Sequence, residues 1–212
     1  MTATRGRLIA LEGIDGCGKS TQVRLLADRV GAVTTFEPGA TPLGAALRAL
    51  LLDRHEASVS ARAEALLMAA DRAQHVAEVL EPALAEGRWV VTDRYAASTL
   101  AYQGYGRGLD RDALDELVSW ATGGLRPDLT VLLDLPVAVA AARRHGGTVD
   151  RMESEAVEFH QRVADGYLAL AADGPDPWLV VDATEPVGSI AASIWAAVET
   201  LAGPDGPPGP SR

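Results

Sequence analysis

The fold is decided by the stretch Gly13-Ile14-Asp15-Gly16-Cys17-Gly18-Lys19-Ser20-Thr21. It matches the pattern G-x-x-x-x-G-K-S, and it follows the apolar run 8–11 and precedes a helical pattern, as a phosphate-binding loop requires. Glycines let successive backbone N–H groups point at one anion, and the helix N-terminus adds partial positive charge. The motif predicts that these nine residues bind a nucleoside triphosphate, with Lys19 at its outer phosphates and the Ser20 hydroxyl on Mg²⁺.

The composition strengthens this interpretation. Of the 19 lysines and arginines in the chain, Lys19 is the one lysine, and every other is an arginine. A guanidinium cannot replace a compact ammonium between phosphates without a change of shape and donor geometry. The alternative interpretation is a glycine-rich turn before an ordinary helix, and it does not explain why the one lysine of the chain stands at this position.

The bulk properties bound the class of protein. The chain has 212 residues, 48% of them hydrophobic, which predicts one domain over residues 1–202 and a disordered Pro/Gly-rich tail over 203–212. No apolar run approaches the roughly 18 residues of a membrane span, and the N-terminal residues lack a signal-peptide pattern. A single cysteine, Cys17, permits no internal disulfide. We therefore expect a cytoplasmic protein with no membrane partner.

The charge excludes one class of partner. The net charge of −10 argues against a nucleic-acid-binding surface. An anionic substrate must then be held by a local cluster of arginines.

The order of elements indicates an α/β fold. Helical patterns separate five apolar segments with strand character, and the segment 104–108, rich in glycine, predicts a flexible hinge between two helices. The predicted strands are 8–11, 32–36, 87–92, 129–135 and 178–182.

Two acidic residues follow predicted strands. Glu37, followed by Pro38, comes directly after the second strand, at the edge where doubly wound sheets bind ligands; a plain connector is the alternative. Asp93 ends the third strand, the pattern that places a second carboxylate beside the Mg²⁺ of a phosphate-binding loop.

Two helical stretches carry candidate binding residues. Met68, Arg72 and His75 share one helical face, which either floors a pocket or consists of solvated polar groups beside a core methionine. A later stretch places hydroxyl, aromatic and amide groups within about two turns, a set suited to reading a base: Ser98, Thr99, Tyr102 and Gln103.

Three arginines flank a Gly-Gly break: Arg143, Arg144 and Arg151. They suggest a mobile segment that closes over phosphates. A solvated helix end, where arginine also favours the helix dipole, is the alternative, and charge alone does not decide between them.

Taken together, the ordered motifs resemble the bacterial thymidylate kinases over nearly the whole chain. The resemblance implies a P-loop NTPase fold with a five-stranded parallel sheet flanked by helices, a mobile lid over about 143–153, a homodimer, and transfer of the γ-phosphoryl group of ATP to dTMP. The segments that carry it are LEGIDGCGKST (11–21), FEPGATPLG (36–44), LLMAADRAQ (66–74), DRYAASTLAYQG (93–104), RPDLTVLLD (126–134) and DRME (150–153).

The resemblance also implies roles for single residues. Arg94 binds the acceptor phosphate, and Arg72 donates to the thymine carbonyl. Thr99 and Tyr102 contact the base and the deoxyribose, and Asp15 orients the acceptor nucleotide. As a mechanistic hypothesis beside the resemblance, we expect Arg48 to help Arg94 hold the acceptor in line.

The same resemblance bears on the catalytic arginine and on selectivity. Members of the family carry an additional catalytic arginine in the loop or in the lid; Gly16 occupies the loop position here, which implies that Arg143, Arg144 or Arg151 takes the role. Met68 stands where an aromatic residue commonly stacks on the base, which implies a softer floor with less shape selection.

Other functions remain alternatives at this point. A kinase for another monophosphate, such as dUMP, CMP or AMP, uses the same parts, and a deoxynucleoside kinase would need a base such as Asp15 or Glu37. A non-catalytic nucleotide-binding module is a further alternative. A guanine-specific switch is disfavoured, because its N-K-x-D segment needs a second lysine.

Overall fold

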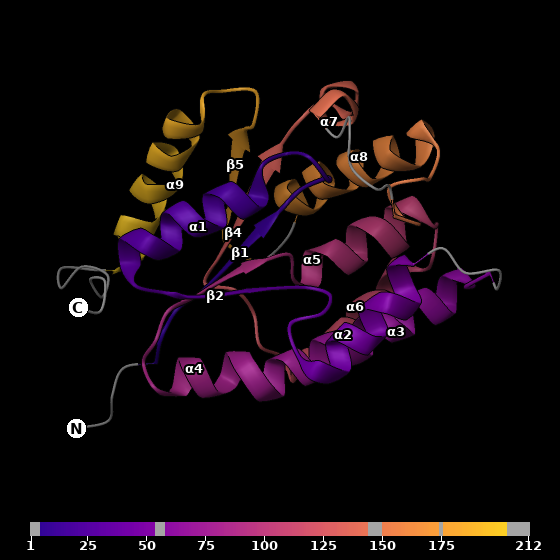
Figure 1. The fold of residues 1–212 in the computed structure, drawn as a ribbon, viewed down its shortest axis with the longest axis horizontal. Helices are drawn as coiled ribbons and strands as arrows, with labels where there is room; N and C mark the ends of the chain where they lie inside the picture. The colour runs from indigo at the N-terminus through magenta and orange to yellow at the C-terminus, as the bar shows by residue number, and fades with distance from the viewer. Residues whose placement is uncertain (1–4, 54–57, 144–149, 174–175, 203–212) are drawn as a thin grey trace.

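The computed structural model describes residues 5–53, 58–143, 150–173 and 176–202. In this part of the chain a five-stranded sheet, in the order β2-β3-β1-β4-β5, is parallel throughout and lies between layers of helices (Figure 1). The predicted α/β class, with a parallel sheet flanked by helices, is therefore confirmed. The strands are β1 Leu8–Glu12, β2 Val33–Phe36, β3 Val90–Asp93, β4 Leu129–Asp134 and β5 Trp178–Asp182.

The helical elements alternate with the strands. They are α1 Lys19–Val30, α2 Pro42–Leu52, α3 Ala61–His75, η1 Val76–Leu80, α4 Glu81–Ala85, α5 Ala96–Thr99, η2 Leu100–Gly106, α6 Arg111–Thr122, α7 Val137–Arg143, α8 Val157–Asp173 and α9 Val187–Ala202; η1 and η2 are π-helical. Helices α1 and α9 cover one side of the sheet, and α3, α4 and α6 lie on the other (Figure 1).

The central strand β1 is apolar because helices cover both of its faces. Ile9 and Leu11 belong to the main hydrophobic core, with residues of α1, whereas Leu8 and Ala10 pack with residues of η1 and α4. Side chains alternate between the two faces of a strand, so a strand covered on both sides reads as a continuous apolar run. The buried Glu12 ends β1, and the phosphate-binding loop follows directly.

The expectation of a flexible hinge at 104–108 is wrong. Gly104 and Gly106 are buried within the helical η2, which continues directly from α5. A Cβ on Gly106 would lie 2.6 Å from the Phe159 ring, and one on Gly166 of α8 would lie 2.5 Å from the Tyr105 ring. These glycines let η2 and α8 pack closely, a requirement that glycine-rich composition does not distinguish from flexibility.

Parallel strands bring their carboxyl ends to the same edge of the sheet. Leu11 of β1 and Phe36 of β2 both lie in register with Asp93 of β3. The segments that follow these three strands therefore meet at one edge, the place where open α/β sheets bind ligands. Among the described residues, no helix is both long and apolar enough to cross a membrane.

Candidate active site

The phosphate-binding loop runs from β1 to α1. Gly13 and Gly18 have φ angles of 135° and 99°, in the region that favours glycine. A Cβ on Gly13 would also lie 2.7 Å from the Leu133 carbonyl oxygen, so a larger residue there would displace β4. The loop thus curls around the N-terminus of α1, where unpaired backbone N–H groups and the helix dipole favour an anion.

Lys19 is held over this loop. Its side chain is 6% exposed, and its Nζ donates to the carbonyl oxygens of Gly13 and Ile14 at 3.0 and 3.1 Å. Asp15 Oδ1 lies 3.9 Å from the same nitrogen. The ammonium is therefore fixed at the mouth of the loop, beside the position that phosphates occupy in this motif.

The two residues predicted to bind Mg²⁺ are in contact. Ser20 Oγ donates to Asp93 Oδ2 at 2.8 Å, so a hydroxyl and a carboxylate oxygen face one another beside the loop. Hard oxygen ligands of this kind suit Mg²⁺, which usually takes its other ligands from water and phosphate. In keeping with such a sparse site, the described residues contain no group of three or more acidic, histidine or cysteine side chains placed to hold a metal.

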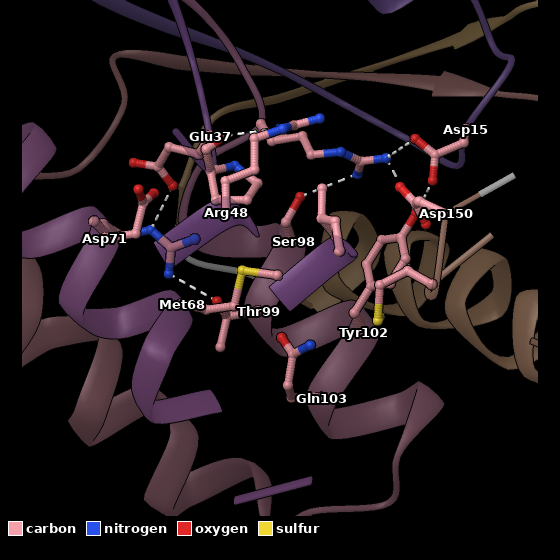
Figure 2. Close-up of a pocket in the computed structure, with 15 residues that line it drawn as sticks. Asp15, Glu37, Arg48, Met68, Asp71, Ser98, Thr99, Tyr102, Gln103 and Asp150 are labelled. Carbon is pink, nitrogen blue, oxygen red and sulfur yellow. Dashed lines mark hydrogen bonds and ion pairs between the residues drawn. The ribbon is translucent and has the colours of Figure 1, made fainter. Parts of the chain in front are cut away.

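Arg94 stands at the centre of the site. It is the one non-glycine residue of the described chain with a positive φ, 74°, a conformation costly enough to need support from its surroundings. Its Nη1 donates to the Gly13 carbonyl at 3.0 Å, and its Nη2 donates to Asp15 Oδ1 at 2.5 Å and to the Tyr102 hydroxyl at 3.1 Å (Figure 2). The guanidinium is thus aimed at the phosphate-binding loop.

Asp15 is held ionised by this arrangement. Burial raises the pKa of its carboxyl, but the positive charges of Arg94 and Lys19 outweigh burial and hold the pKa well below its usual range. The Tyr102 hydroxyl, which accepts from Arg94, donates to Asp15 Oδ2 at 3.2 Å and so contacts both members of the ion pair. The loop carboxylate and the arginine therefore act as one charged unit.

A first cavity lies beyond Arg94, between α2, α3 and η2 (Figure 2). Every residue predicted to bind the acceptor lines it, although the residues come from four separate stretches of sequence. The predicted residues are Glu37, Pro38, Arg48, Met68, Arg72, Arg94, Ser98, Thr99, Tyr102 and Gln103, and Leu52, Asp71, Asp150 and Met152 join them without having been predicted.

A second cavity lies over the phosphate-binding loop. Among the predicted residues it is lined by Gly16, Gly18, Lys19, Ser20, Thr21, Asp93 and Arg143. The two cavities share Asp15, Glu37, Arg48 and Arg94. Two binding spaces therefore meet at the Asp15–Arg94 pair, and Asp15 is the one residue of the phosphate-binding loop that lines both.

The solvated alternative for Arg72 and His75 is wrong, because both side chains are buried. Arg72 Nε donates to Glu37 Oε2 at 2.8 Å, and His75 Nδ1 lies 2.8 Å from Glu37 Oε1. The other Arg72 nitrogens donate to the Thr99 hydroxyl at 2.8 Å and to the Tyr95 carbonyl at 2.9 Å. Glu37 is thus no plain connector: it anchors Arg72 at the wall of the first cavity.

Asp71, next to this network, gives a prediction about stability. Burial and the charge of Glu37 raise the pKa of its carboxyl to about 6, from 3.8. Because the folded state binds this proton more tightly than the unfolded state, ionised Asp71 lowers stability above about pH 6, and this penalty disappears as the pH falls toward 4. Asp71→Asn should therefore raise the free energy of unfolding by about 1–3 kcal/mol at pH 8, and by much less near pH 4.

Urea unfolding of both proteins at the two pH values measures this difference. Asp115→Asn, at an exposed position of α6, is the control and should change stability little at either pH. A gain at pH 8 that persists undiminished at pH 4 would show that the Asp71 charge is not its cause.

The three predicted lid arginines have different positions. Arg143 Nη2 donates to the Ala183 carbonyl at 3.1 Å, and the residue lines the cavity over the phosphate-binding loop. Arg151 instead donates to Leu51 O and Glu64 Oε2, both at 2.7 Å, so its guanidinium is not directed at the loop. Arg144 lies outside the described residues, as do most of the predicted lid and the predicted disordered tail 203–212.

Sequence reasoning missed several residues that build the site. His75 was placed on the correct helical face but given no role, and Glu64, one turn before Met68 on the same face, was overlooked. Both are buried charged or titratable groups. The four-residue spacing of Glu64, Met68 and Arg72 is the signal that could have found Glu64.

Comparison with known proteins agrees with this geometry. The model of the family described as thymidylate kinase matches residues 11–194. A thymidylate kinase from Synechococcus sp. (strain CC9902) is 52% identical over 196 residues, which cover 87% of this chain and 93% of that protein. One from Desulforudis audaxviator is 48% identical over 202 residues, 92% of this chain and 91% of that protein.

A solved structure shares the fold. The thymidylate kinase from Ehrlichia chaffeensis has a TM-score of 0.73 and 29% sequence identity, and the match covers 91% of this chain and 98% of that one. The family match over most of the chain and the identity to these relatives lead to one conclusion: this chain belongs to the thymidylate kinase family.

Proposed function

We propose that this enzyme transfers the γ-phosphoryl group of ATP to dTMP and releases dTDP and ADP. The observation that carries the proposal is the meeting of two cavities at the Asp15–Arg94 pair, one over the phosphate-binding loop and one beyond it. The cavity over the loop takes the donor triphosphate, and the cavity beyond Arg94 takes the acceptor monophosphate. A deoxynucleoside acceptor is disfavoured, because its neutral hydroxyl would give the Arg94 guanidinium no phosphate to bind.

The acceptor needs no general base. The second ionisation of a phosphate monoester lies near pH 6, so the acceptor is largely a dianion at neutral pH and already a nucleophile. The obstacle is repulsion between two highly charged groups, so catalysis consists mostly of positioning and of charge neutralisation. This chain supplies cations on both sides of the meeting point.

On the donor side, the backbone of Gly13–Thr21 binds the phosphates of ATP. Lys19 exchanges its hydrogen bonds to the Gly13 and Ile14 carbonyls for contacts with the outer phosphates. Ser20 and Asp93 would hold Mg²⁺, which neutralises part of the phosphate charge when it is bound. Arg143 is our candidate for the lid arginine, since it lines the donor cavity. Arg151 would have to leave Glu64 and the Leu51 carbonyl to take this role.

On the acceptor side, Arg94 and Arg48 hold the monophosphate. Arg48 Nη1 donates to the Pro38 carbonyl at 2.7 Å and lines both cavities, so it lies near the reacting phosphates. Ser98 donates to Glu12 Oε2 at 2.6 Å and accepts from Arg94 at 3.3 Å. We assign it the positioning of Arg94 rather than direct contact with substrate.

The base binds farther from the donor. Arg72 donates to a carbonyl of thymine, Met68 supplies an apolar and polarizable surface against the ring, and Thr99, Tyr102 and Gln103 complete the wall. Because Met68 is flexible, shape alone gives less selection among bases than an aromatic stack would.

The Mg²⁺ assignment gives a prediction. Asp93→Asn removes the anionic charge but keeps an oxygen, so the Mg²⁺ concentration for half-maximal rate should rise about tenfold or more. A titration of rate against Mg²⁺ at saturating ATP and dTMP measures it. The control is Asp134→Asn, the same change at the end of strand β4, which is separated from β3 by β1 and whose Asp134 lines neither cavity. An unchanged Mg²⁺ requirement in the Asp93 variant would remove this residue from the metal site.

The proposed reaction has a direct test. Incubation of the enzyme with Mg-ATP and dTMP, followed by anion-exchange chromatography, should show dTDP and ADP formed in equal amounts. ATP binding without either product would favour the nucleotide-binding module, and ADP formed only with another monophosphate would favour a different member of the kinase group.

We also propose that the enzyme is a homodimer that works in the cytoplasm, where ATP and dTMP are available. Neighbouring helices expose large apolar side chains, which supports an interface between two copies: Leu50 of α2, Leu66 of α3 and Trp120 of α6 are 51%, 59% and 82% exposed. The acidic balance of the chain supports small anionic substrates held by local arginines, with no nucleic-acid or membrane partner. Sedimentation equilibrium would measure the oligomeric state.

A further inference from the structure

Glu64 is a buried carboxylate behind Gln103 in the wall of the acceptor cavity, and it accepts four hydrogen bonds. Its Oε1 accepts from Gln103 Nε2 at 2.8 Å and from Arg107 Nε at 3.1 Å. Its Oε2 accepts from Arg107 Nη2 at 3.0 Å and from Arg151 Nη2 at 2.7 Å. The side chain itself is 0% exposed and lines neither cavity, so Glu64 acts only through its partners.

The surroundings keep this carboxylate ionised. Burial raises the pKa of Glu64, but the hydrogen bonds from Arg107, Gln103 and Arg151 outweigh it and lower the pKa below its usual value. An ionised carboxylate accepts hydrogen bonds and donates none. Gln103 can therefore meet it only with its NH₂ group.

This contact determines what Gln103 presents to the cavity. An amide that turns its nitrogen to Glu64 must turn its oxygen the other way, and Gln103 lines the acceptor cavity. Figure 2 shows the amide extending from its helix toward the space between Met68 and Tyr102. Oε1 accepts no hydrogen bond from any residue the structure describes.

Another residue of the cavity wall has the complementary character. Arg72 also lines this cavity, and a guanidinium only donates hydrogen bonds. The cavity thus offers a donor from Arg72 and an acceptor from Gln103. Thymine and uracil have a ring N–H next to carbonyl oxygens, which matches this pair, whereas cytosine has a bare ring nitrogen next to an amino group, which reverses it.

We propose that Glu64 is a positioning residue that fixes the Gln103 carbonyl toward the acceptor cavity and so selects pyrimidines with a ring N–H over cytosine. This inference rests on the proposed function, because it concerns the acceptor of the same reaction. It assigns the choice between carbonyl and amino pyrimidines to a residue that never touches the substrate.

Glu64→Gln tests the proposal with little change in shape. If the new amide keeps its oxygen toward the two arginine Nη2 groups, its NH₂ lies against Gln103 Nε2 and Arg107 Nε, which both donate. Gln103 relieves its part of this clash by turning its oxygen to the new amide, whereas the clash with Arg107 Nε remains and does not depend on which nucleotide is bound. Its NH₂ group would then face the cavity and suit cytosine.

The measurement is kcat/KM for dTMP, dUMP and dCMP, with Mg-ATP saturating. In the Glu64→Gln protein the preference for dTMP over dCMP should fall about ten- to a hundredfold, while the preference for dTMP over dUMP stays constant, since both have the ring N–H. Glu64→Asp keeps an acceptor-only group and should retain the preference over dCMP. Glu155→Gln is the matched control, because Glu155 pairs with Arg107 Nη1 at 2.6 Å and does not contact Gln103.

Gln103→Leu separates positioning from mere support of the fold. Alone it should lower the preference for dTMP over dCMP, and adding Glu64→Gln should lower it no further, because Glu64 acts through Gln103. A Glu64→Gln protein that loses activity equally on all three nucleotides would overturn the proposal. Full discrimination in Gln103→Leu would overturn it as well, even if Glu64→Gln does not fold. Failure of the proposed function is a different result: the unaltered enzyme would not phosphorylate dTMP.

Discussion

Arg94→Ala is expected to lower kcat/KM for dTMP by about a thousandfold or more. The guanidinium lines both cavities and donates hydrogen bonds to Gly13 O, Asp15 and Tyr102, at the place where we propose that the acceptor phosphate and the transferred phosphoryl group meet. Its loss removes positive charge at the point of greatest charge repulsion. The backbone strain at φ 74° is unchanged, since alanine also carries a Cβ.

Steady-state rates of ADP release, at varied dTMP and saturating ATP, measure this effect. The matched control is Arg126→Ala, which removes an arginine that is 57% exposed and pairs with Asp176 at 3.1 Å; surface pairs of this kind contribute little. Because Arg94→Ala leaves Asp15 without its main partner, a thermal melt should accompany the rates. A folded variant that turns over dTMP at the normal rate would refute the assignment of Arg94.

Lys19→Ala is expected to have a comparable effect on the donor side. The ammonium lies 3.0 and 3.1 Å from the Gly13 and Ile14 carbonyl oxygens, at the mouth of the loop, where we propose that the outer phosphates of ATP bind. Removing it should abolish ATP-dependent turnover, with a fall in kcat of about a thousandfold or more. The measurement is ADP formation at saturating dTMP over a range of ATP concentrations.

Lys19→Arg is the informative companion variant. It keeps the charge but replaces a compact group with a planar fork, in a space bounded by two backbone carbonyls. We expect it to rescue little of the activity. Strong rescue would mean that charge alone suffices there, and a normal rate in Lys19→Ala would remove the donor-site assignment.

The parts of the fold that depend on local sequence were predictable. The phosphate-binding loop has fixed spacing and lies between an apolar strand and a helix, and β1 reads as apolar because both its faces are covered. The carboxyl ends of parallel strands meet at one edge, so Glu37, Asp93 and Arg94 converge from distant positions. The acceptor residues likewise meet in one cavity.

The parts that depend on distant partners were not predictable. Glycines at 104–108 suggested flexibility, but Gly106 accommodates the close approach of Phe159 on α8, more than 50 residues later. Whether Arg72 of helix α3 is solvated or buried depends on Glu37, which follows strand β2. In the sequence, Arg151 and Arg143 were equal candidates, since both are arginines beside the same Gly-Gly break. Only the fold shows that Arg151 donates a hydrogen bond to Glu64.

The most direct test of the central claim is a parallel measurement of kcat/KM for dTMP, dUMP, CMP, UMP, AMP and GMP, with Mg-ATP as donor and ADP release as the readout. We predict that dTMP gives the highest value, with dUMP the nearest competitor because it has the same ring N–H and Met68 gives little shape selection. Higher kcat/KM for CMP, AMP or GMP than for dTMP, or no ADP with any of the six, would contradict it.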